Sequence, residues 1–504
     1  MLNSRRRTVS RSLTTLLRVV LALCVAAAAA SSAAAQEVVP PSFPELWAAL
    51  QDNAIVPAAA PAPAPADFST DVEARIQARK SYAIPALEIV GFDVLVNLAN
   101  RYTTGDPYHS NLTSIRHNLH HNWVVDNDPF KVNQFWHPYQ GSMYHGFARS
   151  AGLDFWPSLG YTFAGSAFWE IAGETTPPSR NDQIASGIAG SFLGEALFRM
   201  ASLLLERGGD APDVWREIGA AAISPATGFN RLAFGDRFKP IFPSHDPTYY
   251  SRVALGFAAT TQNEPGASSR VKHNEAQVDF SMDYGLPGKP GYTYKRPFDY
   301  FAFQATASSA NGVENILTRG SLLAKDYEVG ANYRGIWGLY GSYDYIAPQI
   351  FRISSTALSL GTTGQWWLSD SIALQGTGMF GAGYAGVGTL HGASDTDYHY
   401  GVAPQALLSL RLIFDGKVSL DAVGREYFVS RIASASTGGH DNILRADTAL
   451  TFRIHRQHAV ALRYVWSRRN ASFSDLGDIT QTRGTIGLFY TYLGHDTFGA
   501  VDWR

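Results

Sequence analysis

The stretch Glu275–Tyr284, EAQVDFSMDY, decides which fold the sequence predicts. Its apolar residues Ala276, Val278, Phe280, Met282 and Tyr284 alternate with Glu275, Gln277, Asp279, Ser281 and Asp283. Strict alternation places the apolar and polar side chains on opposite faces of a β-strand. The stretch is also close to the ~9–11 residues that a tilted strand needs to cross a bilayer.

The same period of two recurs along the chain from about Ser251 to the end. Clear examples are Val329–Tyr345, Leu444–His455 and the stretch from Val460 to Ser467. Hairpin signals such as Asp415-Gly416 and the polar corner Arg456-Gln457 separate neighbouring runs. About a dozen runs of this kind predict an antiparallel outer-membrane-type β-barrel of about 12 strands over residues 245–504.

A soluble β-sandwich or barrel is the alternative, because its strands also have one apolar face. Soluble strands average ~5–6 residues, however, and the runs here are about twice as long. Aromatic pairs end several apolar faces, as in the girdles of membrane barrels: Trp366 and Trp367, Tyr398 and Tyr400, Tyr490 and Tyr492. One departure is the C-terminus, where Arg504 follows Trp503, whereas many such barrels end in an aromatic residue.

The N-terminal 35 residues have the pattern of a secretory signal peptide. Arg5–Arg7 form a basic region, Leu16–Ala30 is apolar apart from one arginine, and Ser31–Ala35 offers small residues for cleavage. Lipoprotein processing at Cys24 is the alternative. Cys24 is the only cysteine, so a chain cleaved after residue 35 has no disulfide and no thiolate metal site.

Export and barrel pattern together predict an outer-membrane protein of a Gram-negative cell, with the periplasm as the alternative location. The expected partners are outer-membrane lipid and, in transit, the export and barrel-assembly machinery. The 41 basic and 43 acidic residues give a formal charge of −2, which implies no nucleic-acid partner.

The part of the chain before the barrel has a different character. Residues 36–70 are rich in Pro and Ala and predict a linker, with a short helix near Pro44–Leu50. Residues 71–240 predict a helical domain rich in small residues, with a His-rich loop after its first helix. The expected helices are Ile84–Asn100, Gly141–Gly152, Phe155–Glu174, Ser179–Arg207 and Asp210–Ala222.

Charged residues interrupt these apolar helices at a spacing of four, which places both members of a pair on one helix face. The pairs are His145/Arg149, Glu170/Glu174 and Glu195/Arg199. A buried charge must be paired, so the helices should either pack together around these groups or line the polar lumen of the barrel. The predicted structural polar network is Arg149, Glu170, Glu174, Asp182, Glu195 and Arg199. Within it, we expect Glu195 to pair with Arg199 and Glu170 to pair with Arg149.

Some of these residues are also candidates for catalysis. His137 or His145, acting with Glu170 or Glu195, could activate water, and together with Glu174 and Asp182 they are donors that suit a metal ion. HExxH and GxSxG motifs do not occur, so we expect neither a metal nor another cofactor. The other candidates have simpler readings. Asp126-Asn-Asp128 should be a turn, the histidines at 117, 120 and 121 should be solvent-exposed, and Arg445, Arg453 and Arg463 should pair with Asp447 and Asp421.

The stretch Trp123–Arg199 resembles the bacterial family called domain of unknown function 3943. The matching residues include Asp126, Asp128, Phe130, Asn133, Gln134, Phe135, Trp136, His137, Tyr144, Arg149, Trp169, Glu170, Glu174, Asn181, Asp182 and Glu195, and Asn230-Arg231-Leu232 resembles the closing motif of that family. The resemblance implies an envelope protein in which a helical segment precedes strands, and it supplies no activity. The leading hypothesis is a non-enzymatic envelope or transport protein whose helical segment caps or plugs the barrel. The alternative is a barrel-embedded hydrolase that acts on envelope lipid.

Overall fold

The computed structural model describes residues 66–126, 128–209, 211–263, 271–348, 350–388, 396–431, 439–473, 477–495 and 498–504. The expected signal peptide and the helix near Pro44–Leu50 lie outside these residues. The chain forms two compact units. The helical unit is Met1–Asp126 with Pro138–His245, and the barrel unit is Asn127–His137 with Asp246–Arg504.

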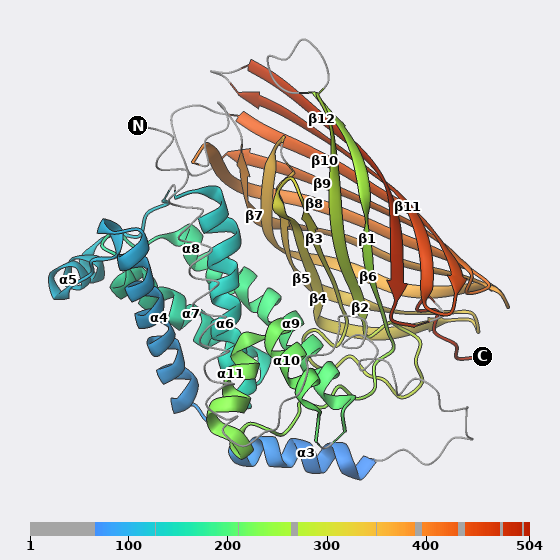
Figure 1. Cartoon of the computed structure of the whole chain (residues 1–504), viewed down its shortest axis with the longest axis horizontal. Helices are drawn as coiled ribbons and strands as arrows, with labels where there is room; N and C mark the ends of the chain where they lie inside the picture. The colour runs from blue at the N-terminus through green and yellow to red at the C-terminus, as the bar shows by residue number, and fades with distance from the viewer. Residues whose placement is uncertain are drawn as a thin grey trace, which may run out of the picture. The chain divides into compact units, whose positions relative to one another are not determined.

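Twelve antiparallel strands form a closed barrel in which each strand pairs with its neighbours in sequence, and β1 pairs with β12 to complete the circle (Figure 1). The strands are β1 (Tyr249–Gln262), β2 (Val271–Tyr284), β3 (Phe301–Ser308), β4 (Gly312–Val329), β5 (Tyr333–Ile346), β6 (Arg352–Ser369), β7 (Ile372–Gly388), β8 (Tyr398–Phe414), β9 (Val418–Arg431), β10 (Gly439–His455), β11 (His458–Phe473) and β12 (Gly477–Leu493). The predicted fold class, a helical segment followed by an antiparallel barrel of about 12 strands, is confirmed.

One predicted strand is wrong in its bounds. Val329–Tyr345 is not a single run, because β4 ends at Val329 and β5 begins at Tyr333. Gly330 has a φ of 62°, a left-handed conformation that glycine adopts without strain, and it turns the chain back. The alternation continues across this tight turn, so the period of two alone does not locate it.

The two ends of the barrel differ in the lengths of their connections. Residues 330–332, 370–371, 415–417 and 456–457 make short turns at one end. The same end also carries the longest connection between two strands, residues 285–300, and the other end carries both short connections, 309–311 and 474–476, and longer ones, 347–351, 389–397 and 432–438. Four of the five connections at the first end are thus tight turns, as is usual at the periplasmic end of an outer-membrane barrel, and 285–300 is the exception.

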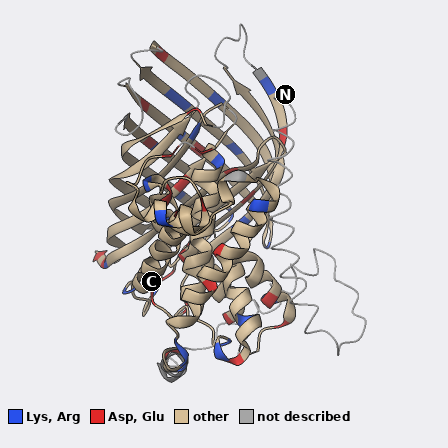
Figure 2. Ribbon diagram, turned by 90° about the vertical axis from the view of Figure 1, so that its left-hand side faces the viewer, with Lys and Arg blue, Asp and Glu red and all other residues tan. Residues whose placement is uncertain are grey.

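The barrel wall is apolar outside and polar inside. Large apolar side chains point outward and are strongly exposed, among them Phe257 (76%), Leu360 (68%) and Phe380 (68%). The inward positions of the same strands carry buried Glu, Asp, Arg, Gln and Thr side chains, and charged residues recur along the strands in Figure 2. This is the polarity of a barrel whose outer surface is covered by lipid.

Ion pairs fill the middle of the lumen. Arg463 contacts both Asp447 and Asp279, and its guanidinium lies 3.1 Å from Asp279. The other lumenal pairs are Arg411 with Asp421 and Asp283, Arg483 with Glu275 and Glu314, and Arg469 with Asp441. Three cavities between described side chains of the lumen have volumes of about 20 to 30 Å³ each, which is room for a water molecule or two.

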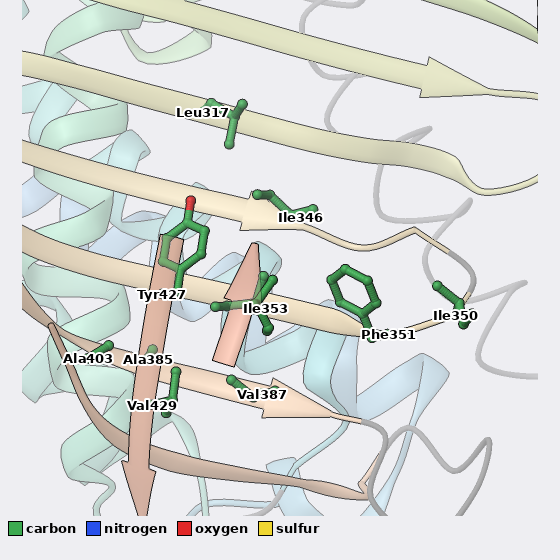
Figure 3. Packing of buried hydrophobic residues seen from close by; sticks show 11 residues of the cluster. Leu317, Ile346, Ile350, Phe351, Ile353, Ala385, Val387, Ala403, Tyr427 and Val429 are labelled. Carbon is green, nitrogen blue, oxygen red and sulfur yellow. The ribbon is translucent and has the colours of Figure 1, made fainter. Parts of the chain in front are cut away.

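Apolar clusters close both ends of this charged zone. At the end with long loops, Leu317, Ile346, Ile350, Phe351 and Ile353 pack with residues of β7 to β10 (Figure 3). At the end with short turns, the chain after β12 folds back against the strands. The carbonyl of Val501 accepts hydrogen bonds from Gln365 (2.7 Å) and from the indole of Trp367 (3.0 Å). The last strand ends at Leu493, so Trp503 and Arg504 belong to this tail rather than to the barrel wall.

Among the described residues, the helical unit contains the five predicted helices, one of them divided in two, and three more, α3, α5 and α11. Its elements are α3 (Ala66–Arg79), α4 (Ala83–Thr103), α5 (Leu112–His120), α6 (His137–Ser150), α7 (Phe155–Phe168), α8 (Arg180–Ile184), α9 (Gly190–Glu206), α10 (Val214–Ile223) and α11 (Pro225–Phe234). The predicted His-rich loop is wrong where α5 forms, since Asn111 and Ser114 make a capping box at its start. The predicted linker is also too long, because α3 begins at Ala66.

Five-residue π-helical turns occur at three places, two of them directly before an α-helix and one at the end of α7. They lie at Val132–Trp136, Trp169–Gly173 and Ala185–Ala189. Each π-turn inserts residues into the helical repeat and so rotates the side chains that follow it. The predicted helix Ser179–Arg207 is therefore α8, a π-turn and α9 in sequence.

Two helical stretches are long and apolar enough to cross a membrane, Ala83–Thr103 and Arg180–Glu206. In the second stretch 83% of the most apolar 18-residue part is buried, as in the core helix of a folded unit. In the first, which is α4, only 22% is buried.

Candidate functional site

Glu195 is the centre of a buried ionic cluster in the helical unit. Its Oε2 accepts a hydrogen bond from Arg149 Nε at 2.7 Å, and its Oε1 accepts one from Arg199 Nε at 2.8 Å. A second nitrogen of Arg149 lies 3.2 Å from Oε1, and His145 Nε2 lies 3.1 Å from Oε2. Both carboxylate oxygens are therefore fully used.

The close contact between α6 and α9 places these side chains together. His145 and Arg149 are one turn apart on α6, and Glu195 and Arg199 are one turn apart on α9. A side chain at Gly194 would overlap the Cβ of His145, and one at Gly190 would overlap the backbone of Gly141. Glycine at these two positions thus allows the helices to approach closely enough for the charges to meet.

The cluster is shielded from water. The side chains of His145 and Glu195 are 0% exposed, and those of Arg149 and Arg199 are 4% and 1% exposed. The guanidinium of Arg149 also lies 4.6 Å from the ring centre of Phe198 and 4.7 Å from that of Phe242. Aromatic faces on a buried cation supply part of the stabilisation that water would otherwise provide.

Burial and charge move the pKa values of these groups in definite directions. Burial alone would raise the pKa of Glu195, but Arg149, the His145 hydrogen bond and Arg199 together hold it well below its usual range. Burial lowers the pKa of His145, so its imidazole is neutral. An ionised carboxylate can only accept a hydrogen bond, so His145 carries its proton on Nε2 and donates it to Glu195.

His145 and Glu195 are the residue types of a catalytic dyad, but no substrate can reach them in this arrangement. Thr162 Oγ1 lies 3.5 Å from His145 Nδ1, the other ring nitrogen, yet this hydroxyl donates to the carbonyl of Ser158 at 2.8 Å. A nucleophile would need to give its proton to the histidine and to reach a substrate. Neither condition is met by a hydroxyl bonded to the backbone in a site with no exposed surface.

The remaining carboxylates of the predicted network have other partners. Arg149 binds Glu195 instead of Glu170, so the expected pairing of Glu170 with Arg149 is wrong. Glu170 accepts a hydrogen bond from the backbone N–H of Ser179 at 2.8 Å, and Glu174 accepts one from the indole of Trp169 at 2.9 Å. Burial and the charge of Glu170 raise the pKa of Asp182 well above its usual range. The expected pairing of Glu195 with Arg199 is present.

The other sequence candidates are placed apart from the Glu195 cluster. His137 is buried at the start of α6, in the short segment that belongs to the barrel unit. His117 and His120 are exposed on α5. Asp126 exchanges two hydrogen bonds with the side chain of Asn181, at 3.0 and 2.6 Å, which gives this acidic stretch a structural role.

The segment Asn127–His137 belongs to the barrel unit, although the sequence predicted it as part of the helical domain. The side chain of Asn133 donates to Tyr398 at 2.9 Å, and that of Gln134 donates to Tyr400 at 2.9 Å. Tyr343 donates to the backbone carbonyl of Gln134 at 2.6 Å. The ring of Phe130, which is fully buried, lies edge-on to Tyr398 at 5.3 Å.

Strand register shows that this segment lies on the outward face of the wall. Side chains two residues apart point to the same side of a strand. On β5, Tyr343 therefore shares a side with Trp337, which is 55% exposed. On β8, Tyr398 and Tyr400 share a side with Leu408, which is 54% exposed.

Two of the predicted girdle aromatics, Tyr398 and Tyr400, are consequently covered by protein rather than by lipid. Their exposed fractions are 6% and 2%. Sequence reasoning missed this site because alternation assigns a residue to the outer face without saying what covers it. The polar Asn133-Gln134 pair beside Phe135-Trp136 was the available signal, since amide side chains inside an aromatic stretch need hydroxyl or backbone partners.

Comparison with protein families confirms the resemblance seen in the sequence. The family described as "Domain of unknown function (DUF3943)" matches residues 122–226. The matched region contains the Glu195 cluster and also the segment that lies on the barrel wall. A comparison with curated proteins found no match.

Among solved structures, the chain is similar to an outer membrane channel from Pseudomonas putida F1, with 12% identity and a TM-score of 0.27 over 49% of this chain and 96% of that one. It is similar to the NanC porin at 4% identity and a TM-score of 0.25, over 47% of this chain and 98% of the porin. The outer membrane phospholipase A from Escherichia coli matches at 12% identity and a TM-score of 0.22, over 47% and 89% of the two chains.

Proposed function

We propose that this chain is a non-enzymatic outer-membrane protein whose barrel is a closed membrane anchor rather than an open channel. The observation that carries the proposal is the filled lumen. Paired arginines and carboxylates occupy its middle, and three cavities between described lumenal side chains measure about 20 to 30 Å³ each. The apolar outer surface of the closed sheet supports a position across the outer membrane.

The same observation bears on the expected helical plug. An apolar cluster and the C-terminal tail already occupy the two ends of the lumen, and barrel side chains fill the space between them. The barrel therefore needs no helix within it to be closed. In this proposal the helical unit, rather than the barrel, carries the envelope function.

The Glu195 cluster supports a structural role for the helical unit. A catalytic histidine needs a path to substrate. His145 and Glu195 have no exposed surface, neutral His145 donates a hydrogen bond to Glu195, and Glu195 is held in an ion pair by Arg149. A hydrolase acting on envelope lipid remains the second candidate, and the pairing of His145 with Glu195 at 3.1 Å is the observation that favours it.

Electrical recording tests the closed lumen. The full chain is purified from the outer-membrane fraction, its folding is checked by heat-modifiable migration on gels, and it is then reconstituted into planar bilayers. We expect no steady conductance from the wild type. Arg483→Ala removes the cation that holds Glu275 and Glu314 together, at 2.7 and 3.0 Å, and is expected to raise the frequency of openings. Steady porin-like conductance from the wild type would refute the closed anchor.

A lipid comparison separates the two functional classes. Deletion cells are complemented with wild type, His145→Gln, His137→Ala or Glu170→Ala, and their envelope lipids are compared at equal protein level. A non-enzymatic protein gives the same lipid profile in every complemented strain. An accumulated lipid substrate in a strain whose variant is folded and abundant would favour the hydrolase.

A further inference from the structure

One face of α4 is exposed and entirely apolar. The buried positions Pro85, Ile89, Asp93 and Asn97 recur every four residues and face the rest of the helical unit. On the opposite side, the exposed residues from one end of the helix to the other are Tyr82, Ala83, Ala86, Leu87, Val90, Gly91, Val94, Leu95, Leu98 and Tyr102. Glu88 and Arg101 are only partly exposed, so α4 has no fully exposed charged residue.

The degree of exposure is unusual for a surface in water. Leu87 is 72% exposed, Leu95 55%, Leu98 54% and Val94 50%. Single exposed apolar residues are normal on soluble proteins, but a contiguous apolar face marks an interaction site. No described residue of the helical unit buries these side chains.

The length and the ends of α4 match a lipid bilayer. Tyr82 and Tyr102 lie 20 residues apart, which at 1.5 Å per residue is about 30 Å, the thickness of the hydrocarbon layer. Both tyrosines are exposed, at 58% and 96%, and Lys80 and Arg101 lie beside them. Aromatic and basic residues at both ends of an apolar stretch are typical of membrane interfaces.

The connections of the chain also favour lipid over a soluble partner. The helical unit is continuous with a membrane-type barrel after His245, four residues before β1 begins at Tyr249. It is also continuous with the segment Asn127–His137, which lies on the outward face of the barrel wall and leads directly into α6. The helical unit is therefore joined by short connections to a barrel whose outer face is apolar, which favours lipid as the occupant of the α4 face.

We propose that the exposed face of α4 is a lipid-binding surface that contacts the acyl chains of the membrane holding the barrel. The buried face of the helix joins it to the helical unit through Ile89, which packs against Tyr144 and Met143. This inference does not depend on whether the lumen conducts.

Spin-label accessibility in the full chain tests the proposal. In a Cys24→Ser background, single cysteines replace Leu87, Val94 or Leu98, and the labelled proteins are placed in vesicles of phosphatidylethanolamine and phosphatidylglycerol. Phe380→Cys, on the outward face of β7, is the lipid-facing reference, and Gln77→Cys, exposed on α3, is the water-facing reference. Heat-modifiable migration verifies that each labelled variant is folded. If one of the three α4 variants does not fold, the other two α4 positions still test the proposal.

We expect the ratio of oxygen to nickel-chelate accessibility at the α4 positions to approach that at Phe380 and to exceed that at Gln77 severalfold. A ratio like that of Gln77 would show that the face is in water and would overturn the proposal. Low accessibility to both reagents would show that protein covers the face, including a second copy of this chain, and would overturn it equally.

Discussion

Replacement of Glu195 by glutamine is the sharpest test of the buried cluster. The change keeps the size of the side chain and removes its charge. In the structure this charge faces Arg149 at 2.7 Å and Arg199 at 2.8 Å, and both guanidinium groups are at most 4% exposed. Breaking a buried ion pair by removing one partner costs about 3–5 kcal/mol, because the remaining charge stays buried without compensation. The folding equilibrium constant should therefore fall by roughly two to four powers of ten.

Urea unfolding of the full chain in detergent micelles, followed by the helical circular dichroism signal, measures this loss. Glu73→Gln is the matched control, because Glu73 is 49% exposed in its pair with His245 and exposed pairs contribute about 0–1 kcal/mol. If Glu195→Gln does not accumulate, the double variant Glu195→Gln/Arg199→Met leaves one buried cation instead of two and is expected to recover part of the stability. Equal unfolding midpoints for Glu195→Gln and Glu73→Gln would refute the reasoning.

Three further predictions concern other parts of the structure. Gly190→Val should destabilise the helical unit by about 1–3 kcal/mol or more, because the added side chain overpacks the contact between α6 and α9. Gly160→Ala should stabilise the unit by about 0.5–1 kcal/mol, because a Cβ at Gly160 would meet no other atom. Thermal melting of both variants measures the difference, and similar melting temperatures would contradict the close helix contact. Phe130→Ala should destabilise the barrel unit by about 3–5 kcal/mol, since it empties a fully buried aromatic site, and its heat-modifiable form should convert at lower temperature than that of Leu360→Ala, an exposed control. Acid should destabilise the helical unit in two stages. Below about pH 6.5 the histidine of the unfolded chain takes up a proton that buried His145, with its lowered pKa, does not, so stability falls. Below about pH 4.3 the carboxylate of the unfolded chain takes up a proton that Glu195, with its lowered pKa, does not, which adds a steeper loss. Melting temperatures that stay constant from pH 7 to pH 5 would contradict a buried neutral His145.

The barrel was predictable because its signal is local. Each strand reports its two faces through alternation, as Glu275–Tyr284 does, and the closed sheet follows from repeating that pattern. The sequence left open whether Leu317–Tyr345 contains a hairpin, and it did not locate the turn at Gly330 because the alternation is continuous across it. The helix α5 was missed because its composition is polar, although its capping residues Asn111 and Ser114 are visible in the sequence.

The candidate site was predictable only up to the choice of partners. A spacing of four shows that Glu195 and Arg199 share a helix face, and they do pair. The spacing does not show which helix packs against the face of α6 that carries Arg149, so Arg149 was expected to bind Glu170 rather than Glu195. The π-turn at Ala185–Ala189 contributes to this limit, because it rotates α9 relative to the residues before it. The periodicity of a single helix carries no information on how that helix packs against another.

The position of Asn127–His137 limits how this protein can have been assembled in evolution. The family match at residues 122–226 looks like a transferable module, yet eleven residues within it are part of the barrel unit. A copy of that module joined to a different barrel would find no hydroxyls for Asn133 and Gln134, which here bind Tyr398 and Tyr400. We therefore expect relatives of this chain to inherit helices and barrel together, with changes at positions 133 and 134 accompanied by changes at the two strand tyrosines.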